Sequence, residues 1–173
     1  MMRHAVVTTT MLVLLGSSPA FGQVPSGTTR YVPQNPRANS KNVREGLESA
    51  LKQVNPLLRP FVRAQLDPKR FDVQVLEFVR DDDGFIIRHD GHSTRSPSSG
   101  VHAALVRGEE NVKLTQHLTA KGARQRFETK QGTLKLTYTF DPRAGTVDVR
   151  ARLTSGYLPS PVTYHLKFRK VLP

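Results

Sequence analysis

The stretch Thr133–Leu153, TLKLTYTFDPRAGTVDVRARL, decides the fold because apolar and polar residues alternate along it on both sides of a central break. The same alternation returns in VTYHLKFR, at Val162–Arg169. A period of two is typical of β-strands that have one buried face and one exposed face. The sequence therefore predicts three consecutive strands, of which the first two form a hairpin.

The break between the first two runs has the composition of a turn. Asp141 can accept a hydrogen bond from the backbone two residues further on, Pro142 presets φ, and Gly145 can adopt the left-handed conformation of a bulged loop. If Phe140 and Thr146 flank the loop, the apolar residues of both strands lie on the same face of the sheet.

The opposite face of these three strands is strongly basic. Its polar positions carry five cations against one acid, Asp148. A cationic sheet face attracts anionic ligands or surfaces. We therefore predict ligand-binding roles for Lys135, Arg150, Arg152, Lys167 and Arg169.

Composition and length describe an ordinary soluble chain. It has 173 residues, a formal net charge of +12 and no cysteine, and its isoelectric point is near 10.6. The length favours one domain, which we expect to span residues 40–173.

Residues 1–22 resemble a secretory signal peptide. Arg3 supplies the positive charge, Ala5–Leu15 forms a short apolar core, and Ala20–Gly22 places small residues before a cleavage site at Gln23. After cleavage no transmembrane span is expected. Export without cysteine is more typical of bacteria than of small animal domains. We therefore expect a periplasmic or secreted bacterial protein.

A leader and a helix follow. Residues 23–39 are rich in proline and polar residues, which predicts a flexible leader; the alternative is a strand or arm that folds on a partner. From Ser40 to Asn55 the apolar residues recur on one helical stripe, with Ser40 or Asn42 as the N-cap. A second short turn is predicted at Pro60–Leu66.

The remainder of the chain predicts further strands joined by short links. Together they make an α+β fold that is mostly β: an N-terminal helix packed on an antiparallel meander of about eight strands. Such a meander forms either a curled sheet or a small barrel, and its interior is either filled by side chains or holds one small ligand.

Few residues suggest catalysis. Asp81–Asp83, followed by glycine, fits a hairpin turn better than a calcium loop, whose ligands alternate. His89 and His92 are weak candidates for metal ligands, with Asp90 beside them, and a solvated loop is the simpler interpretation. The chain has no nucleophile elbow of the form G-x-S-x-G and no phosphate-binding or dinucleotide motif. We therefore expect a protein without enzymatic activity and without a cofactor.

These observations favour an exported binding protein. Its basic sheet face would bind an anionic envelope component, such as lipid or polysaccharide, and the sheet's concavity could also hold an apolar ligand. One alternative is an assembly module that pairs with an acidic envelope protein, and another is a metal-dependent hydrolase that uses His89 and His92. Nucleic acid is not expected as a partner of an exported chain, because aromatic residues are missing from the basic face.

Overall fold

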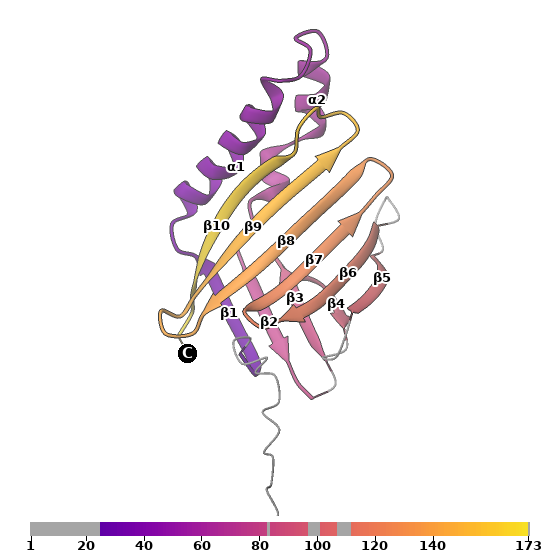
Figure 1. The fold of residues 1–173 in the computed structure, drawn as a ribbon. Helices are drawn as coiled ribbons and strands as arrows, with labels where there is room; N and C mark the ends of the chain where they lie inside the picture. Colours follow the sequence, from indigo (N-terminus) through magenta and orange to yellow (C-terminus); the bar gives the residue numbers. More distant parts are fainter. Residues whose placement is uncertain (1–24, 83, 97–100, 107–111, 173) are drawn as a thin grey trace, which may run out of the picture.

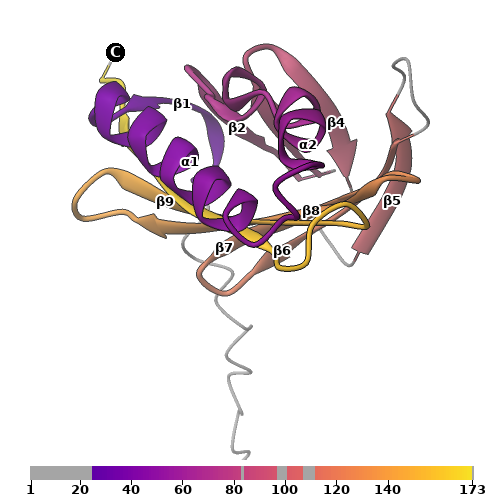
Figure 2. The same ribbon diagram turned by 90° about the horizontal axis from the view of Figure 1, so that it is seen from above.

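The chain folds into one curled antiparallel sheet with two α-helices on its concave side (Figures 1 and 2). A computed structural model describes residues 25–82, 84–96, 101–106 and 112–172. The sheet has ten strands in the order β4-β3-β2-β1-β10-β9-β8-β7-β6-β5. This confirms the predicted fold class in its curled-sheet form. The strands are β1 (Gly27–Pro33), β2 (Leu76–Arg80), β3 (Phe85–His89), β4 (His92–Ser96), β5 (Val101–Val106), β6 (Val112–Thr119), β7 (Gly122–Glu128), β8 (Gly132–Asp141), β9 (Thr146–Ser155) and β10 (Val162–Lys170), and the helices are α1 (Pro36–Leu51), α2 (Arg59–Gln65) and the 3-10 turn η1 (Pro68–Phe71).

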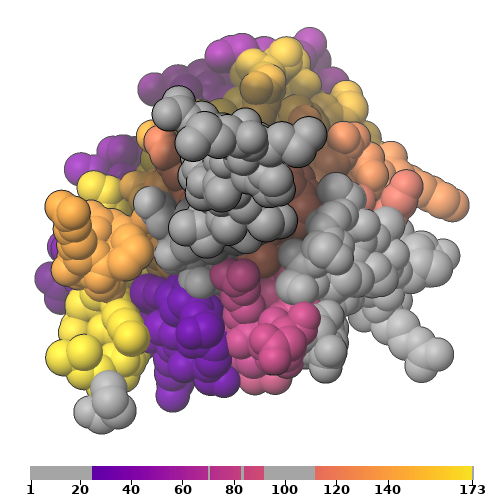
Figure 3. Space-filling model, turned by 60° about the horizontal axis from the view of Figure 1, so that its bottom comes forward, coloured from indigo at the N-terminus to yellow at the C-terminus, as the bar shows by residue number. Residues whose placement is uncertain are grey.

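Two strands more than predicted are present, and β1 is one of them. It lies inside the stretch that was predicted to be a flexible leader, so that prediction is wrong for residues 27–33 and for the start of α1. β1 pairs with β2 on one side and with β10 on the other, and buries Tyr31 to 3% exposure. Figure 3 shows β10 (yellow), β1 (indigo) and the β2–β3 hairpin (magenta) side by side at this end of the sheet. The predicted signal peptide, residues 1–22, lies outside the described residues.

The other additional strand is β4, in a stretch that was predicted to be irregular. β3 and β4 are joined by Asp90 and Gly91, both of which have positive φ (49° and 88°). This conformation belongs to the two-residue hairpin turn for which Asp-Gly is a strong signal. The Asp90 carboxylate also accepts hydrogen bonds from the backbone N–H groups of Gln74 (3.0 Å) and Val75 (2.7 Å).

Helix α1 begins earlier than predicted. Asn35 is the N-cap and accepts a hydrogen bond from the Ala38 N–H at 3.0 Å, while Pro36 occupies the first turn. The apolar stripe that guided the prediction starts only at Val43, because the first turn of the helix packs through polar side chains. Ser40 and Asn42, the two predicted caps, instead bond to Asp72 and to the carbonyl of His165.

Those polar contacts let α1 cover the part of β10 that β1 does not reach. The Asn39 side chain donates to the Lys167 carbonyl (3.1 Å) and accepts from the Lys167 N–H (2.9 Å), as a neighbouring strand would. Two turns further on, Gly46 crosses the strand so closely that an added Cβ would lie 2.5 Å from the Thr163 carbonyl oxygen. The helix therefore closes an edge that would otherwise expose unpaired backbone groups.

The predicted hairpin is present as β8 and β9. Asp141 pairs with Thr146 and Phe140 with Val147. The first strand therefore continues through Asp141, and the loop begins one residue later than expected. Asp141 accepts from the N–H groups of Arg143 and Ala144, both at 3.0 Å, and Gly145 has a φ of 62°. The turn chemistry inferred from the sequence is confirmed.

The core fills one end of the curl and leaves the other open. At the end near the β2–β3 turn, aromatic side chains from opposite walls meet, with ring centroids 4.5 Å apart for Phe78 and Phe140 and 5.9 Å apart for Tyr31 and Phe78. β4 and β5 are the two edge strands of the sheet, yet only residues 97–100 separate them in the chain. β4 also contacts β5, so the sheet curls until its two edge strands approach each other.

Candidate functional site

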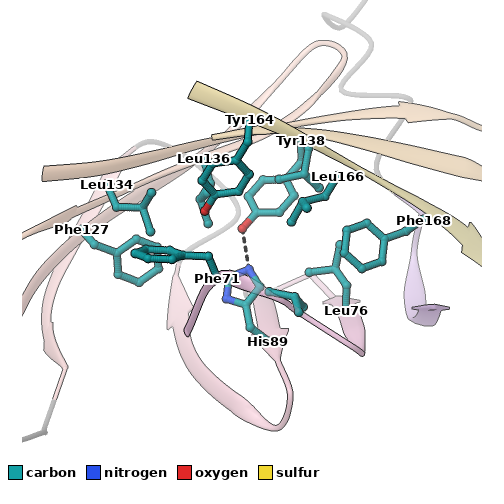
Figure 4. A pocket seen from close by; sticks show the side chains of 12 residues that line it. Phe71, Leu76, His89, Phe127, Leu134, Leu136, Tyr138, Tyr164, Leu166 and Phe168 are labelled. Atoms are coloured by element: carbon teal, nitrogen blue, oxygen red, sulfur yellow. Dashed lines mark hydrogen bonds between the residues drawn. The ribbon is translucent and has the colours of Figure 1, made fainter. Parts of the chain in front are cut away.

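Two adjoining cavities occupy the concave side of the sheet. The inner cavity, of about 150 Å³, lies among β2, β3 and β7–β10, and the outer cavity, of about 330 Å³, opens below α2. Phe71, Phe127 and Leu134 line both, so the two cavities adjoin at these side chains. Figure 4 shows the side chains of the inner cavity. Most of the lining is aliphatic or aromatic, as in pockets for apolar ligands.

A hydrogen bond between opposite walls forms the floor of the inner cavity. Nε2 of His89 on β3 lies 2.6 Å from the hydroxyl oxygen of Tyr138 on β8 (Figure 4). β3 and β8 are five places apart in the sheet order, so this contact spans the concavity. Beneath it, Tyr138 packs edge-on against Phe78, with ring centroids 5.4 Å apart.

Two buried glutamines extend this contact into the sheet. The Tyr138 hydroxyl donates to Oε1 of Gln125 (2.5 Å), and Nε2 of Gln125 donates to Oε1 of Gln116 (2.7 Å). Tyr138, Gln116 and Gln125 are at most 3% exposed. Buried polar side chains are costly unless their hydrogen bonds are satisfied, so this chain holds the floor in one arrangement.

Burial keeps the titratable groups of the cavity uncharged. It lowers the pKa of His89 to about 4, with the Asp90 carboxylate acting in the opposite direction. Burial also raises the pKa of Tyr138 and Tyr164 well above the ordinary value for tyrosine. At neutral pH the cavity therefore presents a neutral imidazole and two neutral phenols.

The mouth of the outer cavity carries exposed apolar side chains. Phe61 of α2 and Tyr157 of the β9–β10 loop are 58% and 51% exposed, and their ring centroids are 6.4 Å apart. Leu57 and Leu58, just before α2, are 88% and 57% exposed. Tyr157 and α2 also line the outer cavity, so this apolar rim continues into the interior.

The five predicted ligand-binding residues lie together on the other side of the sheet. Lys135, Arg150, Arg152, Lys167 and Arg169 are all exposed, on the outer faces of β8, β9 and β10. β7 adds two cations that were not predicted, Arg124 and Arg126. We call these seven residues the basic outer face.

The pairing register brings like charges next to each other on this face. Lys135 pairs directly with Arg126 on one side and with Arg152 on the other. Arg126 contacts Glu128 at 2.6 Å, whereas neither Lys135 nor Arg152 has a salt bridge to a described residue. Like charges on directly opposed positions destabilise a sheet. A shallow hollow of about 450 Å³ lies over this part, bordered by Arg124, Arg126, Lys135, Thr115, His117 and Thr137.

The structure gives the metal hypothesis little support. Within the described part of the chain, no three His, Asp or Glu side chains converge on a point that could hold a metal ion. His89 uses Nε2 for Tyr138, and Asp90 is bonded to backbone N–H groups. His92 pairs with His89 across the hairpin in backbone register, but its side chain lies outside the described part. The Asp81 turn is confirmed by the Asp81 carboxylate, which accepts from the Gly84 N–H at 2.9 Å.

Sequence reasoning missed the cavity floor, although a signal for it exists. Gln116 and Gln125 occupy inward-facing positions of their strands, between Leu114 and Leu118 and before Phe127. A polar residue in the apolar phase of a strand indicates a buried hydrogen-bonded group. Gln116 and Gln125 oppose each other on the neighbouring strands β6 and β7, and Tyr138 lies on the next strand, β8. Only His89 comes from a distant strand, so the pattern alone could not identify that last contact.

Comparisons with known proteins add no name to these features. No protein-family model matches the chain, and the search of characterised proteins found no significantly similar sequence. Among the described residues, no helix has the length and apolar character needed to cross a membrane.

Proposed function

We propose that this protein is an exported, non-enzymatic carrier that holds an apolar ligand in the concavity of its sheet. The observation that carries the proposal is the pair of adjoining, largely apolar cavities between α2 and the His89–Tyr138 floor. A filled β-rich core would leave no such space, because protein interiors are packed to crystal-like density. The two cavities together are in the size range of small-molecule sites.

The rim suggests how the ligand enters. Phe61 and Tyr157, whose rings are in contact, would meet the ligand before it passes below α2. Single exposed apolar residues are normal on a protein surface, but a contiguous group at the mouth of an apolar cavity is typical of interaction sites.

A fluorescence titration tests the carrier function. The environment-sensitive probe N-phenyl-1-naphthylamine should brighten on binding to the wild type. Leu134 lies where the two cavities join, so Leu134→Trp should block the cavity and remove the brightening. Thr137→Trp places the same ring on the outer face and should bind the probe normally. Binding that persists in Leu134→Trp, or that disappears equally in Thr137→Trp, would overturn the proposal.

Native mass spectrometry tests it on material from cells. Protein purified gently from its source should carry an additional mass that denaturing extraction releases as an apolar molecule. A bare monomer from cells, together with failure of the probe to bind, would count against a carrier.

A second candidate function rests on the basic outer face. The row Arg126, Lys135 and Arg152 places three cations on adjacent strands, which lie about 4.8 Å apart. An arrangement that costs stability in the free protein becomes favourable when an anion binds it. This supports the proposal that the face binds an anionic envelope component, such as a lipid headgroup, an acidic polysaccharide or an acidic protein.

Vesicle binding distinguishes this function from the first. Replacing Arg126, Lys135, Arg150 and Arg152 with glutamine should abolish salt-sensitive binding to phosphatidylglycerol vesicles and leave probe binding unchanged. The matched control replaces four exposed cations on the helical side: Lys41, Arg44, Lys52 and Lys69. If both quadruple variants lose vesicle binding equally, net charge rather than this face is responsible. If neither loses it, the face is not the site. A single acidic protein that co-purifies with the wild type but not with the first variant would instead support an assembly module.

A further inference from the structure

The hydrogen bonds at the cavity floor determine which nitrogen of His89 carries the proton. Gln125 donates through Nε2 to Gln116, so its Oε1 is the acceptor for the Tyr138 hydroxyl. The single hydroxyl proton of Tyr138 is used in that bond, which leaves only lone pairs on its oxygen. The 2.6 Å contact therefore requires Nε2 of His89 to be the donor. A neutral imidazole that is protonated on Nε2 has an acceptor lone pair on Nδ1.

That lone pair is available to a ligand. Nδ1 of His89 has no hydrogen-bond partner among the described residues, and His89 lines the inner cavity. Asp90, its nearest carboxylate in the chain, is bonded to Gln74 and Val75. The ring of His89 is therefore held by Tyr138 on one edge and presents an acceptor on another.

A donor lies across the same cavity. Tyr164 on β10 lines the inner cavity, and its hydroxyl points into the space above His89 in Figure 4. Tyr164 contacts Phe71 through its ring, with centroids 6.1 Å apart, and its hydroxyl is bonded to no described residue. Tyr138 also lines the inner cavity, but its hydroxyl already donates to Gln125 and accepts from His89, and the other lining side chains are hydrocarbon. The cavity thus offers one free acceptor and one free hydroxyl in apolar surroundings.

We propose that the ligand is a neutral apolar alcohol, whose hydroxyl donates to Nδ1 of His89 and accepts from the hydroxyl of Tyr164 at the floor of the cavity. This inference rests on the proposed carrier function and specifies its ligand class. A hydroxyl both donates and accepts, so it satisfies both groups. An ionised carboxylate has no proton for the imidazole and loses its hydration, and a pure hydrocarbon leaves both protein groups unpaired.

The test compares three probes of equal chain length at neutral pH: decanol, decyl methyl ether and decanoate. Each is titrated as a competitor of the bound fluorescent probe. The ether retains the oxygen acceptor but lacks the donor, so decanol should bind on the order of tenfold more tightly than the ether. Decanoate should bind more weakly than decanol. Equal binding of decanol and ether, or tighter binding of decanoate, overturns the inference.

Variants assign the preference to the two residues. In His89→Phe, decanol and ether should bind equally, because the acceptor is gone while the apolar space remains. In Tyr164→Phe, the preference for decanol over ether should persist, because His89 still accepts the donor, and both compounds should bind more weakly. A preference that survives in His89→Phe overturns the assignment. The wild-type comparison remains a test even if a variant does not fold. If none of the three compounds displaces the fluorescent probe, the ligand class is overturned and the carrier function stands. If the fluorescent probe itself does not bind, both the ligand class and the carrier function are overturned.

Discussion

The buried hydroxyl of Tyr138 offers a direct test of the cavity floor. Tyr138→Phe removes one oxygen atom and leaves the ring in its place against Phe78. Gln125, which is 3% exposed, then loses the donor to its Oε1, and Nε2 of His89 loses its acceptor. Leaving a buried polar atom unpaired costs about 1–3 kcal/mol. We expect a loss of about 2 kcal/mol, at the centre of that range, because only the Gln125 end is fully enclosed.

Urea denaturation followed by circular dichroism measures this loss. In a chain of this length, about 2 kcal/mol lowers the melting temperature by roughly 4–8 °C. Tyr157→Phe is the matched control, because the Tyr157 hydroxyl bonds to no described residue and the side chain is 51% exposed. It should change stability by less than about 0.5 kcal/mol.

A double-mutant cycle shows whether the loss comes from the hydrogen bond itself. Gln125→Leu removes the acceptor, so adding Tyr138→Phe to it should cost less than Tyr138→Phe alone, with a coupling energy of about 1 kcal/mol or more. If Tyr138→Phe is as mild as the control, or if the two changes are additive, the hydrogen-bonded floor does not stabilise the fold and the proton assignment of His89 loses its basis.

Three further perturbations address the helix contact, the imidazole and the outer face. Gly46→Ala should cost about 2 kcal/mol, since its methyl group would meet a β10 carbonyl oxygen, whereas Gly156→Ala, with open space around it, should be near neutral in the same melting assay. The pKa of His89 is about 4 in the folded protein, with the Asp90 carboxylate opposing the shift, and about 6.5 in the unfolded chain, so between these pH values this imidazole is protonated only in the unfolded state. The free energy of unfolding of the wild type should therefore fall by about 3 kcal/mol as the pH falls from about 6.5 to about 4. A His89→Phe variant that lacks this pH dependence would confirm the assignment. Lys135→Glu should raise stability by about 0.5 kcal/mol at low ionic strength by relieving repulsion between neighbouring strands, and a gain that is unchanged in 1 M salt would show that charge is not its cause.

The sequence predicts best those parts of the fold whose order is local. β8, β9 and β10 follow from period-two alternation, and their turn from Asp141 and Gly145, because each strand pairs with its neighbour in the chain. The positions of Lys135, Arg150 and Arg152 on one face follow from the same period. Their roles as ligand-binding residues stay a prediction, because exposure on a face does not itself identify a ligand.

The parts that the sequence does not predict depend on distant partners. β1 has an ordinary loop composition, and it becomes a strand because it lies between β2 and β10, whose edges supply its hydrogen bonds. Helix α1 starts seven residues before Val43, the first member of its apolar stripe, because Asn39 bonds to Lys167 across 128 positions of the chain. His89 reaches Tyr138 across 49 positions, so no local pattern identifies this contact, although Gln116 and Gln125 mark buried polar positions beside it.

The central position of β1 has a consequence for the motion of the sheet. Among the described strands, β1 alone joins the β2–β4 unit to the β10–β5 unit through backbone pairing. Its register with β10 covers Tyr31, Val32 and Pro33. His89 belongs to the first unit and Tyr138 to the second. This ladder is the shortest among the described strands, so we expect the two walls to separate most readily along it. Native-state hydrogen exchange should find the β1–β10 amides exchanging faster than those of the ten-residue β8–β9 ladder. A ligand that binds between the walls should slow that exchange from a distance, by holding the two units together.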